Sequence, residues 1–135
     1  MRGADGGPWR RICALPAFWV GLMYDQDSLD AAWDLVKDWT VEERQAMRDG
    51  VARTALATPF RNRTLRDIAQ DALALSRHGL TRRRHLNGEG LDETMFISSL
   101  EEIVATGVTP AEVMLREYET TWQHDVRPAF REYAY

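Results

Sequence analysis

The sequence predicts a mainly α-helical protein, for three reasons. Apolar residues recur at spacings of three and four along much of the chain, which is the period of one helix face. Serine, threonine or aspartate stands directly before several of these stretches, where a helix N-cap is expected. No run of alternating polar and apolar residues is long enough to predict a β-strand. With 135 residues, the chain can form one domain with a core of its own.

The first helix is expected in the apolar stretch of residues 12–24, directly after a glycine-rich opening. Three glycines let the backbone of this opening take conformations that other residues avoid: Gly3, Gly6 and Gly7. Pro8 fixes the exit from the loop, and Pro16 is placed to begin the helix, because proline is favoured in the first turn. The apolar stretch is too short to cross a bilayer, so no membrane contact is expected.

Two helices are expected to follow. Ser28 can cap the first, which runs to about Trp39. Its apolar residues share one face: Leu29, Ala32, Trp33, Val36 and Trp39. Thr40 and Glu43 then form a capping box, in which each side chain accepts a hydrogen bond from the backbone of the other residue. Gly50 is expected to end the short helix that this box opens.

Residues 51–63 show no helical period and contain the pair Thr58-Pro59, so we expect a connecting loop with one short extended piece. Thr64 caps the most regular helix of the chain, and Gly79 is expected to end it, since glycine suits the left-handed position after a helix. One side of this helix is apolar and carries Leu65, Ile68, Ala69, Ala72 and Leu75.

Two further helices are expected near the end of the chain. Asp92 can cap a helix that Gly107 ends. The pair Thr109-Pro110 is a cap followed by proline at the first helical position, and it opens a helix through about Tyr118. Glu112 and Arg116 lie one turn apart in that helix, where they are expected to form an ion pair.

Composition limits the classes of function. The net charge is −4 and the isoelectric point is about 5.4, so no basic excess indicates nucleic acid as a partner. One basic cluster consists of Arg77, Arg82, Arg83, Arg84 and His85. No aromatic residues interleave it, so a solvated helix face is favoured, and a small nucleic-acid-binding helical domain is the weakest alternative.

Metal and disulfide chemistry are not indicated. His78, His85 and His124 lie far apart and lack ligand spacing with one another or with Cys13, so no metal ligand is assigned in this chain. A single cysteine excludes an internal disulfide, which suits a reducing compartment. The first residues also lack the order of a signal peptide, and a cytoplasmic location is therefore expected.

The order of residues, beyond these single elements, resembles a known family. Residues 2–11 read RGADGGPWRR, and residues 14–22 read ALPAFWVGL. Both stretches look like the signature of the glutamate–cysteine ligases of the plant and proteobacterial type, the first enzymes of glutathione synthesis. The resemblance continues through TPFR at residues 58–61 and TGVTPAE at residues 106–112 to the last residues. It covers the whole chain, but only about the last third of the family's length.

The resemblance implies a place for this chain in a larger fold. The family's enzymes have an N-terminal α/β body that resembles glutamine synthetase and carries most of the active site. The chain is then the helical C-terminal lobe of such a ligase, with the N-terminal β-sheet body missing. Residues 1–135 form a single partial domain, in which residues 1–24 are an active-site loop and first apolar helix and residues 25–135 are the helical lobe.

The resemblance also implies an activity. Such a ligase forms γ-glutamylcysteine from L-glutamate and L-cysteine through an acyl phosphate, and it uses ATP and Mg²⁺. This chain alone is expected to be inactive, because most of the nucleotide and metal ligands would lie outside it, in the missing N-terminal body of the ligase. The alternative is a helical interaction module, or a subunit that completes a split ligase without activity of its own. A helical lobe without its body would expose an apolar face, which favours self-association.

Candidate site residues lie in the opening stretch. The resemblance makes Arg2 the candidate catalytic residue and Trp19 a wall of the glutamate pocket, although an indole in an apolar helix is often a core residue. Arg10 and Arg11 are candidate substrate-binding residues, since the guanidinium fork binds carboxylate or phosphate oxygens two at a time. They can also pair with neighbouring acids. Asp5 is a further candidate, but aspartate in such a loop ordinarily stabilises a turn.

Overall fold

The computed structural model describes residues 8–133, and this part of the chain confirms the predicted mainly α class. The helices, including two short 3₁₀ helices η1 and η2, are α1 Trp9–Ile12, α2 Ala14–Met23, α3 Gln26–Val36, α4 Val41–Thr54, η1 Ala55–Ala57, α5 Leu65–Arg83, η2 Glu93–Ile97, α6 Ser98–Thr106, α7 Pro110–Glu119 and α8 Ala129–Glu132. Within the described range the sheet structure is one antiparallel pair, β1 Pro59–Phe60 and β2 Arg63–Thr64.

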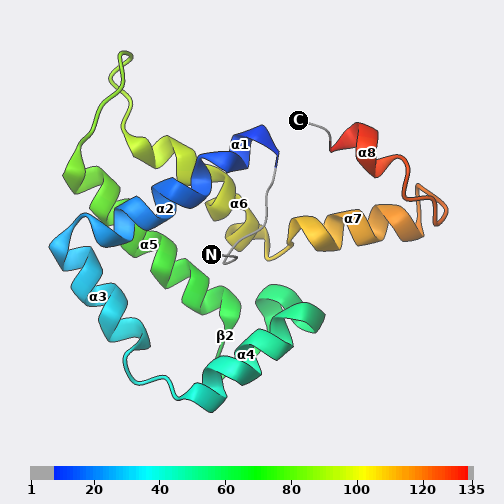
Figure 1. Cartoon of the computed structure of the whole chain (residues 1–135), viewed down its shortest axis with the longest axis horizontal. Helices are drawn as coiled ribbons and strands as arrows, with labels where there is room; N and C mark the ends of the chain where they lie inside the picture. The colour runs from blue at the N-terminus through cyan, green and yellow to red at the C-terminus, as the bar shows by residue number, and fades with distance from the viewer. Residues whose placement is uncertain (1–7, 134–135) are drawn as a thin grey trace.

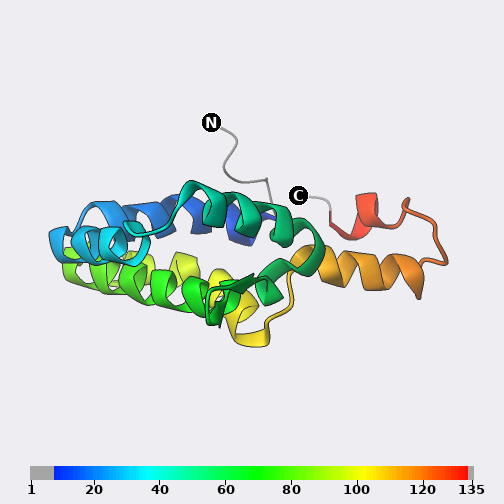
Figure 2. The same ribbon diagram turned by 90° about the horizontal axis from the view of Figure 1, so that it is seen from below.

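The helices form two layers and an arm. Figure 2 shows α2 and α4 in one layer and α5 and α6 in the other, with α3 at one end. Figure 1 shows α2 crossing α5. Helix α7 leads away from this body, and α8 folds back beside α7. The buried core lies where α2, α5 and η2 meet, around Ala17, Leu80 and Ile97.

The backbones of α2 and α5 touch where they cross. A Cβ atom added to Gly79 would lie 1.9 Å from the carbonyl oxygen of Gly21, and one added to Gly21 would lie 2.2 Å from the carbonyl oxygen of Ser76. The hydroxyl of Ser76 donates a hydrogen bond of 2.9 Å to the carbonyl oxygen of Phe18. The prediction that Gly79 ends its helix is therefore wrong. Gly79 allows close packing, and α5 continues to Arg83, before Arg84 adopts the left-handed conformation.

Gly50 likewise lies inside a helix. A Cβ atom there would be 2.5 Å from the Cγ2 methyl of Thr58, so the glycine leaves room for the segment that follows α4. The predicted stop at Gly50 is wrong, and the predicted loop at residues 51–63 is only partly correct. The last turn of α4 and η1 occupy its first half, and a hairpin that pairs Pro59 with Thr64 occupies its second.

The starts of α2 and α3 differ from the prediction by a few residues. Pro16 is the third residue of α2 rather than the first, which the helix tolerates because backbone N–H groups in the first turn have no partner within the helix. Asp25, not Ser28, caps α3, and its carboxylate accepts the backbone N–H of Ser28 at 3.0 Å. On the apolar face predicted for this helix, Leu29 and Trp33 are exposed, whereas Ala32, Val36 and Trp39 are partly buried, so the face is only partly covered.

The predicted caps of the other helices are confirmed. Capping boxes open α4, α5 and α7 at Thr40, Thr64 and Thr109, and the carboxylate of Asp92 accepts the backbone N–H of Thr94 at the start of η2. Gly107 ends α6 with φ of 74°. The box at Thr109 uses the carboxylate of Glu112, so the predicted ion pair with Arg116 does not form. None of the described helices is both long and apolar enough to cross a membrane.

Glu43 joins the start of α4 to the hairpin. Its carboxylate accepts hydrogen bonds from Arg61 Nε at 2.7 Å and Arg61 Nη2 at 2.8 Å, and from the backbone N–H of Thr40 at 2.9 Å. The bonds from Arg61, followed by the bond from Thr40, lower the pKa of Glu43 to about 2. A carboxyl group with a lowered pKa in the folded state stabilises the fold only while it is ionised.

With Glu43 replaced by glutamine, the protein should lose less stability as the pH falls. Between about pH 4.5 and pH 2 the unfolded chain binds a proton at Glu43 that the folded chain does not, so stability falls as the pH falls through this window. Thermal midpoints measured across this range should fall less steeply for Glu43→Gln than for the unchanged protein. Glu119→Gln is the matched control, because Glu119 is exposed and forms no ion pair with any described residue. Equal slopes for the two variants would contradict the prediction.

Candidate functional site

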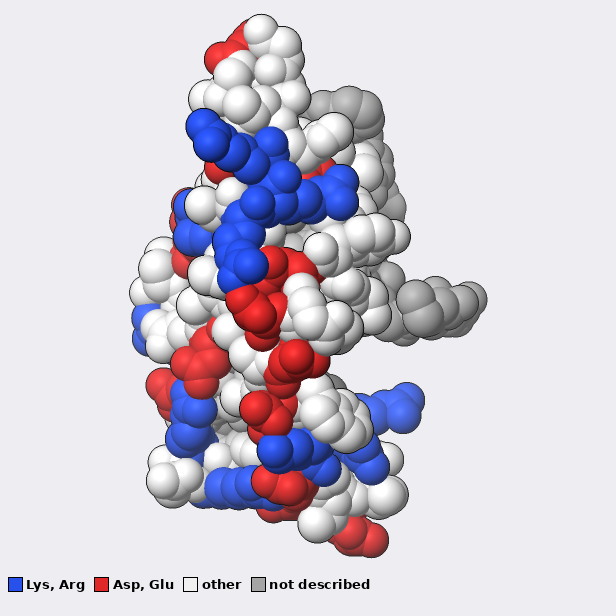
Figure 3. Space-filling view, turned by 90° about the vertical axis from the view of Figure 1, so that its left-hand side faces the viewer, with Lys and Arg blue, Asp and Glu red and all other residues white. Residues whose placement is uncertain are grey.

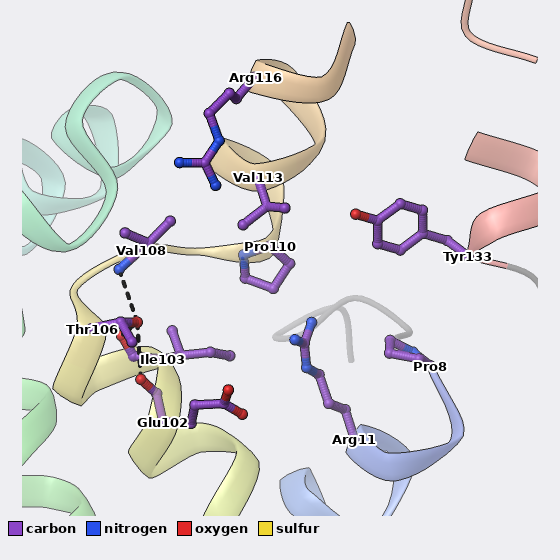
Figure 4. Close-up of a pocket in the computed structure, with 10 residues that line it drawn as sticks. All are labelled: Pro8, Arg11, Glu102, Ile103, Thr106, Val108, Pro110, Val113, Arg116 and Tyr133. Carbon is purple, nitrogen blue, oxygen red and sulfur yellow. Dashed lines mark hydrogen bonds between the residues drawn. The ribbon is translucent and has the colours of Figure 1, made fainter. Parts of the chain in front are cut away.

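A cavity of about 520 Å³ lies where the start of α1 faces α6, α7 and the end of α8 (Figure 4). The residues that line it are Pro8, Arg11, Glu102, Ile103, Thr106, Val108, Pro110, Val113, Arg116 and Tyr133. Most of this lining is apolar, and a few polar side chains converge on it, which is the usual make-up of a small-molecule site. We therefore take this cavity as the candidate functional site.

Two arginines bring positive charge to the cavity from different helices. Arg11 reaches in from α1 and Arg116 from α7, while the carboxylate of Glu102 and the hydroxyl of Tyr133 also turn toward the space (Figure 4). The Nε of Arg11 is buried and has no hydrogen-bond partner. Within residues 8–133, Arg116 forms no ion pair. Leaving a buried donor unpaired costs about 1–3 kcal/mol, so an acceptor placed beside Arg11 would be bound favourably.

Local structure fixes both arginines on helices. Pro8 precedes α1, and its carbonyl oxygen accepts the N–H of Arg11 at 2.7 Å, which closes the first turn. Thr109 and Pro110 set the start of α7 on the opposite side of the cavity. Arg66 binds the C-terminal end of α6: its Nε donates to the carbonyl oxygen of Val104 at 2.7 Å and its Nη2 donates to that of Ala105. A cavity framed by helix starts keeps its shape better than one framed by loops.

The cavity suits an anion that also has an apolar part. The planar guanidinium groups of Arg11 and Arg116 can each present two donors to a carboxylate or phosphate. The apolar wall of Ile103, Val108 and Val113 can pack on methylene groups. Two arginines outweigh the single Glu102, so the balance of charge favours an anionic ligand.

The structure brings one of the predicted site residues into this cavity. Arg11 lines it, whereas Trp19 does not. Trp19 lies on α2 with 49% of its surface exposed, and its ring meets that of Phe18 edge to face at 5.5 Å. Five other candidates lie outside the described residues: Arg2, Gly3, Asp5, Gly6 and Gly7. Arg10 belongs to α1, but its side chain is likewise outside what the structure describes.

Sequence reasoning missed Arg116, Glu102 and Tyr133 as cavity residues. The spacing of Arg116 from Glu112 indicated an ion pair, but the capping box already uses that carboxylate. Arg116 and Arg11 are far apart in the sequence, and no local pattern links them. The sequence showed only that Arg116 lies in a helix with a strong N-cap. It did not show which part of the molecule that helix faces.

The described residues do not fit a magnesium site at the cavity. Asp25, Asp27 and His78 place possible ligand atoms within 4.8 Å of one another, but none of the three lines the cavity. Arg82 already binds both carboxylates, with its Nε 3.1 Å from Asp25 and its Nη1 paired with Asp27. The backbone N–H of Ser28, and to a smaller extent Arg82, lower the pKa of Asp25. A guanidinium therefore already binds both carboxylates of this group and offsets one of their two negative charges.

The basic cluster of the sequence forms ion pairs. Arg77 binds Glu101 at 2.5 Å and Arg83 binds Glu93 at 2.8 Å, and Arg82 binds the two aspartates already described. Figure 3 shows a group of basic side chains directly beside acidic ones on the end of the molecule that it views. This arrangement favours the solvated helix face over a nucleic-acid surface, which needs unpaired basic groups.

Comparisons with known proteins cover the whole chain. The model of glutamate–cysteine ligase family 2 matches residues 1–132. Glutamate–cysteine ligase A, chloroplastic, of Oryza sativa subsp. indica is 52% identical over 135 residues, which are 100% of this chain and 26% of the rice protein. Glutamate–cysteine ligase, chloroplastic, of Arabidopsis thaliana is 53% identical over the same length, which is 25% of that protein.

These matches also correct two expectations. The chain spans about a quarter of the length of the curated relatives it matches, not a third. The expected cytoplasmic location is wrong by the same comparison, because the relatives are named as chloroplastic proteins. A single cysteine, and the reducing compartment that it suits, could not distinguish the cytoplasm from a chloroplast, since neither feature specifies an organelle.

Proposed function

Because the chain belongs to glutamate–cysteine ligase family 2, we propose that it is the C-terminal part of a ligase that joins L-glutamate to L-cysteine in glutathione synthesis. The observation that carries this proposal is the identity of about half of all residues, along the full length of the chain, with proteins named as glutamate–cysteine ligases. The chain spans only a quarter of those proteins, so the rest of the active site would lie in the other three quarters.

The cavity supports a specific role for this chain in the proposed reaction. Glutamate carries two carboxylates joined by methylene groups, and the cavity offers two arginines beside an apolar wall. Arg11 and Arg116 would bind a carboxylate of the substrate, or a phosphate oxygen, and hold it in one orientation. ATP, when bound, supplies the phosphoryl group that activates the γ-carboxylate of glutamate for attack by the amine of cysteine. We assign no magnesium ligand to the described residues.

The opening loop would complete the site from outside the described range. We propose Arg2 as the residue that stabilises negative charge on the reacting oxygens, with the glycines and Asp5 shaping the loop around it. Arg10 would bind substrate from α1, next to Arg11. Trp19 would form a wall of the glutamate pocket with segments outside this chain, since its indole is half exposed on α2. Residues 1–24 would thus serve the active site, and residues 25–135 would form the supporting helical lobe.

Complementation tests the proposal. The purified chain would be assayed alone and mixed with the part of rice glutamate–cysteine ligase A that lies outside the matched region. We expect phosphate release that depends on glutamate, cysteine and ATP only in the mixture. The intact rice enzyme is the positive control, and omission of cysteine is the negative control. Activity of the chain alone would contradict our expectation that most of the site lies elsewhere.

A mixture that associates but releases no phosphate would favour the alternative. In that case the chain would be an interaction module that contributes surface rather than catalytic groups. A mixture that shows neither association nor activity would overturn both versions, because either one requires the chain to join the rest of a ligase.

A further inference from the structure

Helix α2 has no polar side. Its ten residues read ALPAFWVGLM; none of them carries a charge, and the indole N–H of Trp19 is the only polar group among their side chains. One side of the helix packs on α5 and is buried at Ala14, Ala17, Gly21 and Leu22. An amphipathic surface helix would place charged residues on the other side, but α2 has none to place there.

The side of α2 that faces away from α5 carries an apolar stripe. Leu15, Trp19 and Met23 follow one another at intervals of four residues, which places them in a row along the helix. They are 40%, 49% and 57% exposed. We call these three residues the α2 stripe. Three large apolar side chains in one row, each about half uncovered, indicate a surface that is buried in its working state.

Helix α2 is too short to span a bilayer. Ten helical residues extend about 15 Å, whereas the hydrocarbon core of a membrane is about 30 Å thick. A helix that is apolar all round and too short to span a membrane belongs in the interior of a larger protein, with protein on both sides. Within the described residues, α5 and its neighbours provide one of those sides.

We propose that the α2 stripe is the surface on which the rest of the ligase docks, an inference that rests on the proposed function. The argument comes from the length of chain that is absent: this chain matches relatives along all of its residues yet spans only 25–26% of their length. The other three quarters must contact this quarter somewhere, and the stripe is an apolar surface of the kind that forms interface cores. The partner is therefore a large folded segment with a complementary apolar patch.

Binding of the two parts tests the docking surface. Isothermal titration calorimetry would measure the affinity of this chain for the part of rice glutamate–cysteine ligase A outside the matched region. The double variant Leu15→Gln and Met23→Gln leaves Trp19, a proposed pocket residue, unchanged. We expect its dissociation constant to rise at least about tenfold, since two large side chains are then polar at the centre of the contact. Val126→Gln is the matched control, because Val126 is 55% exposed and belongs to the segment between α7 and α8, which Figure 1 shows away from α2.

The outcomes separate docking from folding and from catalysis. Circular dichroism should give the same thermal midpoint for the double variant and the unchanged chain, because the replaced side chains are about half exposed. If the double variant binds as tightly as the unchanged chain, the docking proposal is overturned, even when the mixture releases phosphate. If the unchanged parts bind without releasing phosphate, the ligase proposal fails while docking through the stripe is retained. If the stripe only joins two copies of this chain, sedimentation would detect a dimer of the chain, and calorimetry would detect no binding to the rice segment. That result would also overturn the proposal.

Discussion

Replacing Gly79 with alanine should destabilise the protein on the order of 3 kcal/mol or more, or prevent folding. The added Cβ would lie 1.9 Å from the carbonyl oxygen of Gly21, and the positions of both atoms are fixed by the backbones of packed helices. In an uncrowded helix the same change would stabilise by about 1 kcal/mol, because alanine is the better helix former. The sign of the effect therefore reports the contact between α2 and α5.

Unfolding in urea, followed by circular dichroism, measures this effect against two other glycines. Gly88→Ala is the matched control, since no atom lies within 4 Å of its added Cβ, and stability should change by less than about 0.5 kcal/mol. Gly50→Ala should fall between the two, because the methyl group of Thr58 at 2.5 Å can shift more easily than a backbone. If the Gly79 variant were as stable as the Gly88 variant, the two helices could not cross as closely as described.

Replacing Arg11 with alanine should lower kcat/KM of the complemented ligase by about 100-fold, the usual cost of removing one group that stabilises charge in an active site. The Nε of Arg11 is buried without a partner, so this N–H forms no hydrogen bond in the free protein and is available to a bound anion. Stability of the free chain should therefore be unchanged or slightly higher. Arg11→Lys should also lose activity, because an ammonium cannot form the two-pronged contact.

Steady-state kinetics of the mixture with the rice segment would show which anion Arg11 binds. A rise in KM for glutamate would indicate its carboxylate, and a rise in KM for ATP would indicate phosphate. Arg48→Ala is the matched control, because Arg48 is an exposed arginine of α4 that does not line the cavity. Equal activity of the Arg11 and Arg48 variants would remove Arg11, and with it the cavity, from the proposed site.

Local signals predicted the helix starts well. Thr40, Thr64 and Thr109 cap helices as expected, because a capping box depends on residues only three positions apart. The ends were harder. Glycine is the residue type expected at the end of a helix, but Gly50 and Gly79 lie inside helices. Each leaves room for another segment that approaches the helix closely. That choice depends on contacts with residues distant in the sequence, which no local pattern contains.

The same distinction applies to the candidate site. Arg11 could be proposed because it lies within a stretch that resembles the family signature, and the structure then places it in the cavity. Arg116 and Tyr133 could not, since they reach the cavity only through the path of α7 and α8 (Figure 1). Trp19 shows the limit of the resemblance. Its proposed role depends on a segment that covers α2, and within the described residues its indole stays half exposed.

The apolar character of α2 also sets a condition on how the protein is made. Ribosomes synthesise α2 well before α5, and the hydrogen bond between Ser76 and Phe18 joins residues 58 positions apart. Until α5 has emerged, both sides of α2 are exposed to water, and the nascent chain presents ten consecutive apolar residues. Such a segment is an aggregation hazard and a natural target for chaperones that bind extended apolar sequences. Protection of α2 during synthesis would therefore reduce the aggregation of the nascent chain.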